Sequence, residues 1–284
     1  CVFENTLVPD DLDERLARYE AIVCVSNWNA ELVRARSTKP VHVVHEGIDE
    51  SLFFPGPRSR VLDPGRFYVF SGGKVEFRKA QDLVLLAFRE FASRHEDAVL
   101  VAAWHSPWTR FSAGFQGRLS HPLGLAADGS LQIRRWAVEN GVPERQFVEL
   151  PAMPNPLVPA VLREMDCALQ VSRCEAGTNF PAKEAMACGV PVILAVNTGV
   201  RDLADEDNCV PLRDQRAVKS GPEQGTDNWG ESSVEEIVDA LERLYSDADL
   251  RRRISAAGVR WLIDHERTWW GHAGRLKAAV LGLF

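Results

Sequence analysis

The segment spanning residues 167–192 holds the residue types best suited to chemistry. The apolar run at 167–172 predicts a strand, which leads through the loop Gly177-Thr178-Asn179 into a helix over 181–188. Pro181 falls near the first turn of that helix, where proline is favoured. Glycine permits close backbone approach, and the free N–H groups at a helix start bind anions. The pattern therefore predicts an anion site between this strand and this helix.

Glu184 lies about one turn into the same predicted helix, within reach of the same pocket. A carboxylate there would repel a phosphate, so its natural partners are neutral hydroxyls such as those of a ribose or a sugar. A glutamate on a helix is by itself usually a solvated residue. Its position beside the predicted anion site favours a role in ligand binding.

A second group of charged residues follows the strand predicted at 67–72. Lys74 lies two residues after that strand, and Arg78 and Lys79 stand just before a helix predicted over 80–96. Cations are unfavourable beside a helix start unless an anion sits there. The alternative is a solvated surface pair, but the placement favours binding of a phosphate.

Several familiar sites are excluded. The stretch SGGKVEF lacks the GxGxxG spacing of dinucleotide folds and the GxxxxGK[ST] spacing of P-loop enzymes. The seven histidines show neither HxxxH nor HExxH spacing, and the six cysteines form no CxxC pair. The sequence therefore predicts no metal, no nicotinamide cofactor and no cofactor of another kind.

Short apolar runs alternate with segments of helical period along most of the chain. Strands are expected at 21–26, 41–44, 67–72, 98–104, 147–150, 167–172 and 191–196. Helices are expected at 12–19, 29–36, 80–96, 131–141, 156–165, 181–188, 233–246, 248–265 and 268–283. Apolar strands bridged by helices predict an α/β fold, a doubly wound parallel sheet flanked by helices. Residues 105–130 and 213–231 are expected to be irregular loops, and GIDESLFFPGP to be a linker.

Composition limits the partners. The formal net charge is −7 and the pI about 5.6, so nucleic-acid binding is not expected. Cysteines spread through apolar runs indicate buried, reduced thiols and a cytoplasmic protein. No apolar stretch reaches the roughly 18 residues of a membrane span. The tryptophans at 261, 269 and 270 favour helix packing, with peripheral membrane contact as the alternative.

Four ordered motifs resemble the retaining glycosyltransferases of family 4, which have the two-domain GT-B fold. EAGTNFPAKEAMACGVPV is similar to the E-x7-E signature of that family, with eight residues rather than seven between Glu175 and Glu184. VHVVHEGIDESLFFP resembles the interdomain segment, and SGGKVEFRKAQD resembles the donor-phosphate loop. ERTWWGHAGRL resembles the crossover helix. The likeness extends over about residues 40–284.

The resemblance implies a role for each matching residue of the first motif. Glu184 would hold the ribose hydroxyls of a nucleotide-sugar donor, and Glu175 a hydroxyl of the donor sugar. The backbone amides of Gly177, Thr178 and Asn179 would cradle the diphosphate. Glu175 is expected to be one of the catalytic residues.

In the second motif, Lys74 and Lys79 would neutralise the departing diphosphate as catalytic residues, with Arg78 and Gly73 at the donor site. Lys74 stands where the family commonly has arginine. Breaking a glycosidic bond to a diphosphate builds negative charge on the leaving oxygen, which fixed cations and a helix start can stabilise without a metal.

The resemblance also implies a division of the chain. Residues 1–46 would be a remnant of the acceptor-side Rossmann-like domain, 47–266 the donor-binding domain, and 267–284 the crossover helix. Because the chain opens at Cys1 with a run typical of a chain interior, we expect a fragment with little transfer activity alone. Four short elements bury too little apolar surface for a core of their own, so we expect them to pack on the donor domain.

The sequence thus predicts transfer of a sugar, with retention, from a nucleotide diphosphate to a carbohydrate or lipid-linked acceptor. The alternative is a non-catalytic nucleotide-sugar-binding module or a degenerate transferase subunit, which would share the same donor motifs. An epimerase of related fold would need an acid/base set, and no such set is identified in the sequence.

Overall fold

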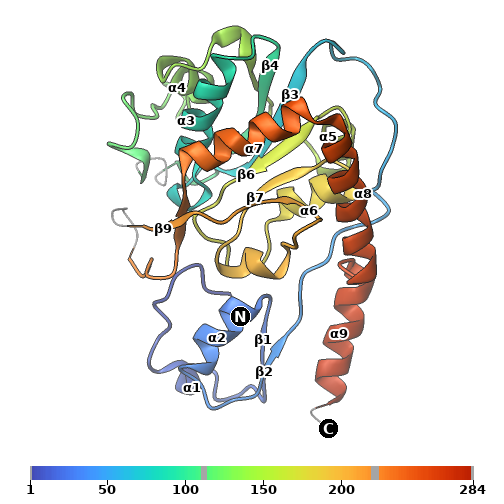
Figure 1. Ribbon diagram of the computed structural model, residues 1–284. Coiled ribbons are helices and arrows are strands. Elements are labelled where there is room, and N and C mark those ends of the chain that lie inside the picture. Colours follow the sequence, from blue (N-terminus) through green and yellow to red (C-terminus); the bar gives the residue numbers. More distant parts are fainter. Residues whose placement is uncertain (1, 110–113, 219–223, 283–284) are drawn as a thin grey trace.

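A six-stranded parallel sheet forms the centre of the molecule (Figure 1). The computed structural model describes residues 2–109, 114–218 and 224–282. The strands are β3 (Phe67–Lys74), β4 (Ala98–His105), β5 (Phe147–Glu149), β6 (Cys167–Gln170), β7 (Val192–Ala195) and β8 (Val210–Leu212). Their order is β5-β4-β3-β6-β7-β8, and every neighbouring pair is parallel. The doubly wound α/β class predicted from the sequence is confirmed.

Helices cover both faces of the sheet. Buried side chains of α3 (Gln81–Ala92), α4 (Ile133–Glu139) and α7 (Val234–Ser246) form one hydrophobic cluster with the sheet. Those of α5 (Val158–Leu162) and α6 (Phe180–Ala187) form the cluster on the other face with Leu262 of α8 (Ala248–Asp264), whereas Ile254 of α8 belongs to the first cluster. Along β3, Val69 belongs to the first cluster and its neighbours Tyr68 and Phe70 to the second. This alternation explains why the strand is apolar at nearly every position.

The strand order reverses between β3 and β6. From β3 the chain winds outward through β4 to β5, and it then returns to pair β6 with β3 before continuing through β7 to β8. Ligands of open parallel sheets bind outside the carboxyl ends of the strands at such a reversal. The loops that follow Lys74 and Gln170 therefore mark the expected site.

Residues 2–46 form a small unit at one end of the sheet (Figure 1). Its elements are α1 (Leu12–Arg15), β1 (Ile22–Cys24), α2 (Asn27–Arg34) and β2 (Val41–Val43), and β1 and β2 pair in parallel. The expectation that this unit has no core of its own is wrong, because six buried apolar residues form a separate cluster: Val8, Leu12, Ile22, Cys24, Ala30 and Val33. The unit also contacts the large sheet domain, with the Ser26 hydroxyl donating to the Ala176 carbonyl.

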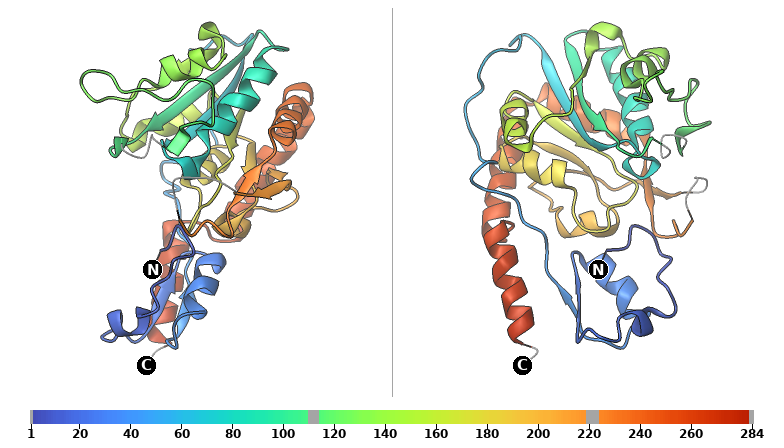
Figure 2. Two further views of the ribbon diagram at one scale, coloured as in Figure 1. Left: turned by 90° about the vertical axis from the view of Figure 1, so that its left-hand side faces the viewer. Right: turned by 180° about the vertical axis from the view of Figure 1, so that it is seen from behind.

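The linker and the last helix cross each other beside this unit. Ile48 donates its backbone N–H to the Arg267 carbonyl, and its own carbonyl accepts from Trp269. A Cβ at Gly47 would overlap the backbone of Thr268, which explains the glycine at this crossing. From there α9 (Trp269–Leu281) runs alongside residues 2–46, as both views in Figure 2 show.

Three strands of the structure, β8, β9 and β10, were not expected from the sequence. The run at 210–212 forms β8 at the sheet edge, where Pro211 is tolerated because an edge strand has one unpaired side. Within 213–231, β9 (Gln215–Ala217) and β10 (Gly230–Ser232) pair in antiparallel fashion, so this stretch is not wholly a loop. Short 3-10 turns lie at Phe77–Lys79, Glu144–Gln146, Asn155–Leu157 and Thr198–Asp202.

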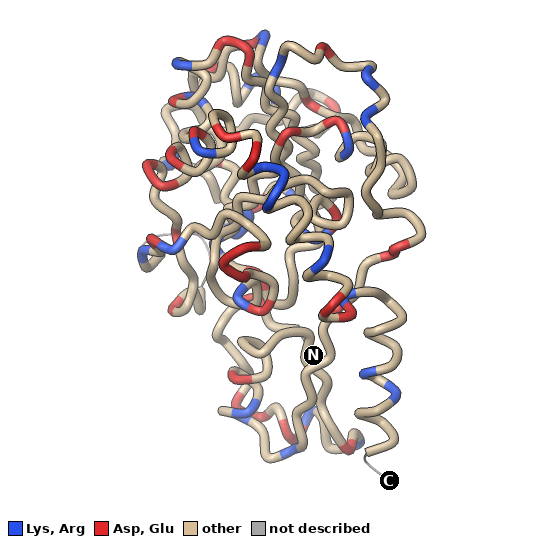
Figure 3. Tube along the Cα trace, turned by 45° about the vertical axis from the view of Figure 1, so that its right-hand side comes forward, with Lys and Arg blue, Asp and Glu red and all other residues tan. Residues whose placement is uncertain are grey.

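Three further features concern the cysteines, the length of the helices and the distribution of charge. Cys24, Cys167, Cys174, Cys188 and Cys209 are buried and form no disulfide, and Cys1 lies outside the described residues. Within the described residues, no helix has the length and apolar character to cross a membrane. Basic and acidic residues are interspersed along the chain in Figure 3 rather than separated into opposite faces.

Candidate active site

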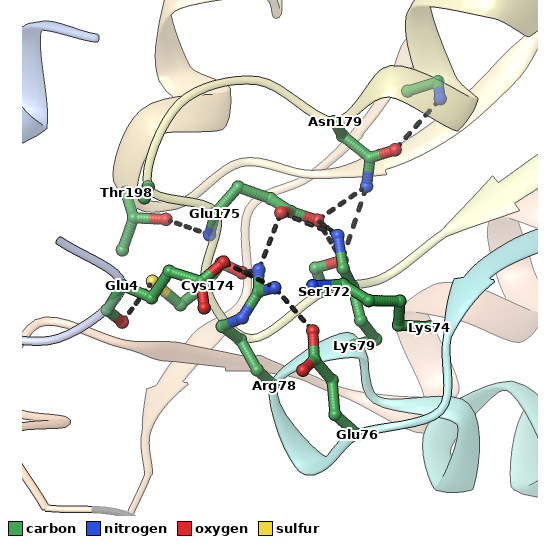
Figure 4. A network of polar contacts seen from close by, with 12 residues as sticks. Glu4, Lys74, Glu76, Arg78, Lys79, Ser172, Cys174, Glu175, Asn179 and Thr198 are labelled. Atoms are coloured by element: carbon green, nitrogen blue, oxygen red, sulfur yellow. Dashed lines mark hydrogen bonds and ion pairs between the residues drawn. The ribbon is translucent and has the colours of Figure 1, made fainter. Parts of the chain in front are cut away.

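Lys79 and Glu175 meet at the point where the strand order reverses (Figure 4). Lys79 lies in the loop between β3 and α3, and Glu175 in the loop between β6 and α6. The Lys79 Nζ atom lies 2.6 Å from Oε1 and 2.8 Å from Oε2 of the Glu175 carboxylate. The fold therefore brings together two loops whose interacting residues, Lys79 and Glu175, lie 96 positions apart in the sequence.

Arg78 is a second cation on the same carboxylate. Its guanidinium donates to Glu175 at 2.8 Å, to the Cys174 carbonyl at 2.9 Å and to Glu76 at 2.5 Å. A third carboxylate, Glu4, lies 2.8 Å from the Nη2 atom of Arg78. Arg78 is 3% exposed, so it is held in a largely enclosed position.

Neutral donors complete the environment of Glu175. The Ser172 hydroxyl donates to its Oε1 atom at 2.7 Å, and the Asn179 amide donates to the same oxygen at 3.0 Å. The backbone N–H of Glu175 donates to the Thr198 hydroxyl. A carboxylate that is 3% exposed and bound by this many donors is held in one orientation.

The electrostatics favour an ionised Glu175. Burial alone would raise its pKa, but the adjacent Lys79 and Arg78 outweigh burial and lower the pKa of Glu175 below its ordinary value. Burial lowers the pKa of Lys79, and Glu175 opposes that change. The carboxylates around Arg78 raise its pKa despite its burial. The site thus holds a fixed negative charge between two cations.

The start of α6 faces residues 2–46. Asn179 caps this helix, because its side-chain oxygen accepts from the backbone N–H of Ala182. A Cβ at Gly177 would approach Val25 to 2.6 Å and Glu46 to 2.9 Å, so the loop packs closely against the small unit. Within the described residues, the backbone N–H groups of Gly177 and Thr178 donate to no acceptor. Unpaired N–H groups at a helix start are the kind of donor that binds anions.

Glu184 lies on α6, outside the group around Glu175. Burial raises the pKa of Glu184 to about 7, partly offset by the neighbouring Lys183. Burial also lowers the pKa of Lys183 to about 7, and its ammonium donates to the Glu46 carbonyl at 2.7 Å. Such paired shifts are common at functional sites.

Lys74 and Gly73 end β3. The Lys74 ammonium lies 5.0 Å from the centre of the Trp108 ring, and among the described residues no hydrogen bond or ion pair joins it to Glu175. Gly73 has a φ of 140°, a conformation that favours glycine over other residues. The structure therefore brings Arg78, Lys79, Glu175 and Asn179 together, and leaves Lys74 beside this group.

A fully buried ion pair lies behind the site. Arg173 binds the Asp82 carboxylate through both of its terminal nitrogens, at 2.9 Å and 2.7 Å, and donates to Glu231 at 2.6 Å. It also donates to the Phe77 carbonyl at 2.7 Å. Arg173 therefore ties the loop after β3 to the loop after β6.

Glu4, Glu76, Ser172, Thr198 and Arg173 were not predicted from the sequence. Ser172 ends the apolar run before the predicted loop, which could have marked it as a candidate. Glu4 reaches the site only because residues 2–46 pack against it, and no local pattern signals that contact. Within the described residues, no group of three His, Cys, Asp or Glu side chains is placed to hold a metal.

Comparison with known proteins places the chain among transferases. The family model described as "Glycosyl transferases group 1" matches residues 57–261. The D-inositol 3-phosphate glycosyltransferase 1 of Catenulispora acidiphila is 30% identical over 166 residues, which cover 57% of this chain and 36% of that protein. The D-inositol 3-phosphate glycosyltransferase of Mycobacteroides abscessus is 26% identical, and the match covers 81% of this chain and 46% of that protein. The chain thus spans less than half the length of these relatives.

Solved structures show the same fold. Sucrose-phosphate synthase from Thermosynechococcus elongatus superposes with a TM-score of 0.68 at 18% identity, covering 95% of this chain and 60% of that one. The Anabaena protein HepE in complex with UDP and glucose gives a TM-score of 0.64 at 14% identity, covering 99% and 70%. The family match extends over most of the chain and includes both loops of the site. The chain belongs to the glycosyl transferases group 1 family.

Proposed function

We propose that this chain binds a nucleotide diphosphate sugar at the β3–β6 reversal as the donor-binding part of a retaining, metal-independent glycosyltransferase. The observation that carries the proposal is the meeting of Lys79, Arg78 and Glu175 beside the start of α6. Two fixed cations and two N–H groups without acceptors are the donors that the oxygens of a leaving diphosphate require. The UDP complex of the Anabaena structure supports a nucleotide ligand for this fold.

Each residue has a proposed task. Lys79 neutralises the leaving diphosphate, and Gly177 and Thr178 donate to its oxygens. Glu175 holds Lys79 and Arg78 in place, and it accepts from a donor-sugar hydroxyl by exchanging one of its five present donor contacts. Glu184 accepts from the ribose hydroxyls, and Lys74 reaches the diphosphate from the end of β3.

In the transfer step, the bond between the anomeric carbon and the diphosphate oxygen breaks. The acceptor oxygen forms its new bond to that carbon on the same face of the sugar, and its proton passes to the leaving diphosphate. The cations act by stabilising charge that develops on the leaving oxygen, so the step requires no metal.

The acceptor would approach from the side of residues 2–46. Because two relatives are named D-inositol 3-phosphate glycosyltransferases, a cyclitol phosphate is the first acceptor to test. A non-catalytic nucleotide-sugar-binding module is the second candidate, since it would share the donor site. A chain that binds nucleotide but transfers sugar to no acceptor would favour this alternative.

Calorimetry with UDP, GDP and ADP, in the presence of excess EDTA, tests the donor site. We expect one of the three to bind without metal. We expect Lys79→Ala to weaken that binding about ten- to a hundredfold, because it removes a charge-assisted hydrogen bond. Lys277→Ala, which removes an exposed cation on α9, is the matched control and should leave the affinity unchanged. A strict requirement for Mg²⁺ or Mn²⁺, or equal affinity in Lys79→Ala, would contradict the proposal.

A further inference from the structure

Glu4 occupies an unusual place beside the donor site. Its carboxylate comes from residues 2–46, yet it lies 2.8 Å from Nη2 of Arg78, a guanidinium in the loop after β3 (Figure 4). Arg78 and Lys79 thus face three carboxylates: Glu4, Glu76 and Glu175. Around these two cations the three carboxylates leave an excess of negative charge, which opposes the binding of a diphosphate to Arg78 and Lys79 unless one carboxylate moves away.

Only one of the three carboxylates is free to leave. Glu175 is fixed by Lys79, Ser172 and Asn179, and the Glu76 side chain is 9% exposed. The Glu4 side chain is 50% exposed, and its one ion pair among the described residues is with Arg78. Glu4 is therefore the member of the group that can exchange with solvent or with a ligand.

The backbone of Glu4 is held independently of its carboxylate. Its carbonyl accepts from the Cys174 thiol at 3.3 Å and from the Trp229 indole at 3.1 Å. The next residues are anchored as well, since Thr6 donates its N–H to the Gly225 carbonyl. The side chain can thus rotate away from Arg78 while the segment stays in place.

We propose that the Glu4 carboxylate stands in for a phosphate group, filling a phosphate position on the Nη2 edge of Arg78 until a nucleoside diphosphate displaces it. Carboxylate and phosphate oxygens both accept charge-assisted bonds from a guanidinium, so a phosphate can take over the bond that the Glu4 carboxylate makes. This inference rests on the proposed nucleotide site, and it adds that the Glu4 carboxylate competes with the diphosphate for Arg78. Displacing Glu4 would remove the excess negative charge as the diphosphate arrives.

Glu4→Gln and Glu4→Ala test the exchange. Both remove the competing charge from a half-exposed position, so we expect the folded chain to bind UDP about three- to tenfold more tightly than the unmodified chain. Inorganic pyrophosphate is the second probe and should show the same gain, because the effect concerns the phosphates rather than the base. Glu14→Gln makes the same charge change on exposed α1 and should leave both affinities unchanged.

The outcomes separate this inference from the proposed function. If the unmodified chain binds UDP and Lys79→Ala weakens that binding, the donor site stands. Unchanged or weaker binding by both Glu4 variants would then overturn the stand-in role. If neither UDP nor pyrophosphate binds the unmodified chain or the Glu4 variants, the donor site itself is wrong for these ligands and the inference fails with it. Thermal unfolding of each variant checks that the chain is folded.

Discussion

At the scale of single residues, the environment of Glu184 has a consequence for stability. Burial raises the pKa of Glu184 from 4.5 to about 7, so the folded chain binds this proton more tightly than the unfolded chain does. Stability falls with rising pH wherever the folded state holds more protons. Ionisation of Glu184 therefore destabilises the fold progressively between about pH 4.5 and pH 7, a cost that a bound ribose could offset.

Glu184→Gln removes this titration. Relative to the unmodified chain, we expect the variant to gain stability as the pH rises from 5 to 8, on the order of 1–2 kcal/mol, while its affinity for nucleotide falls. Lys183, whose pKa burial lowers to about 7, loses the opposing charge of Glu184 in the variant, so its pKa falls further and adds to the gain in the same direction. Urea unfolding at pH 5, 6, 7 and 8 measures the difference. A difference that does not change with pH would contradict the buried-carboxylate account, and Glu14→Gln is the exposed control.

At the scale of elements, the start of α6 connects helix stability to the donor site. Asn179 uses its two ends differently: the oxygen caps the helix at Ala182, and the nitrogen donates to Glu175. Ser233 caps α7 by accepting from the backbone N–H of Glu236, and among the described residues none of its side-chain hydrogen bonds reaches the group around Glu175. Removing each cap in turn therefore distinguishes the effect of losing an N-cap, which both residues provide, from the effect of losing the bond to Glu175, which Asn179 provides.

Asn179→Ala and Ser233→Ala should each lower the free energy of unfolding by about 1 kcal/mol, because each removes an N-cap. Only Asn179→Ala should also weaken UDP binding, by about tenfold, since Glu175 loses a donor that orients it. Urea unfolding and calorimetry on the same samples give both quantities. Equal UDP affinities for the two variants would show that the Asn179–Glu175 bond does not shape the site.

At the scale of the whole molecule, Asp202 fastens residues 2–46 to the sheet domain. Its carboxylate accepts from the backbone and the side chain of Asn27, at 2.6 Å and 3.1 Å, and from the His45 ring at 3.1 Å. Its backbone carbonyl accepts from Arg267, near the start of α9. One residue thus meets α2, the end of the small unit at His45 and the C-terminal crossing.

Asp202→Ala should loosen this contact without unfolding the sheet. We expect amide hydrogen exchange in β1 and α2 to become about ten- to a hundredfold faster, because charge-assisted bonds to the small unit are lost. Exchange in β3 and β4 should stay unchanged. Asp264→Ala, at the exposed end of α8, is the matched control. Equal exchange rates in β1 and α2 for all three chains would show that other contacts suffice to hold the unit.

The amino-acid sequence by itself determined the layered fold and the loops that carry the site. Strand and helix periods are local, so the central strands and the helices around them could be read from the apolar pattern. The positions of Lys79, Glu175 and Asn179 in loops before helices were also visible locally. Edge strand β8 and the β9–β10 pair were missed, because three-residue strands gain their stability from partners elsewhere in the chain.

Only the tertiary structure decided how the charged residues combine. Lys79 and Arg78 were expected to face a ligand, and the structure shows them on Glu175, because buried charges need partners of opposite charge. The contact between Glu4 and Arg78 joins the first residues of the chain to the loop after β3, across 74 positions that share no local pattern. Such contacts depend on how the separate elements pack, which the period of a sequence does not encode.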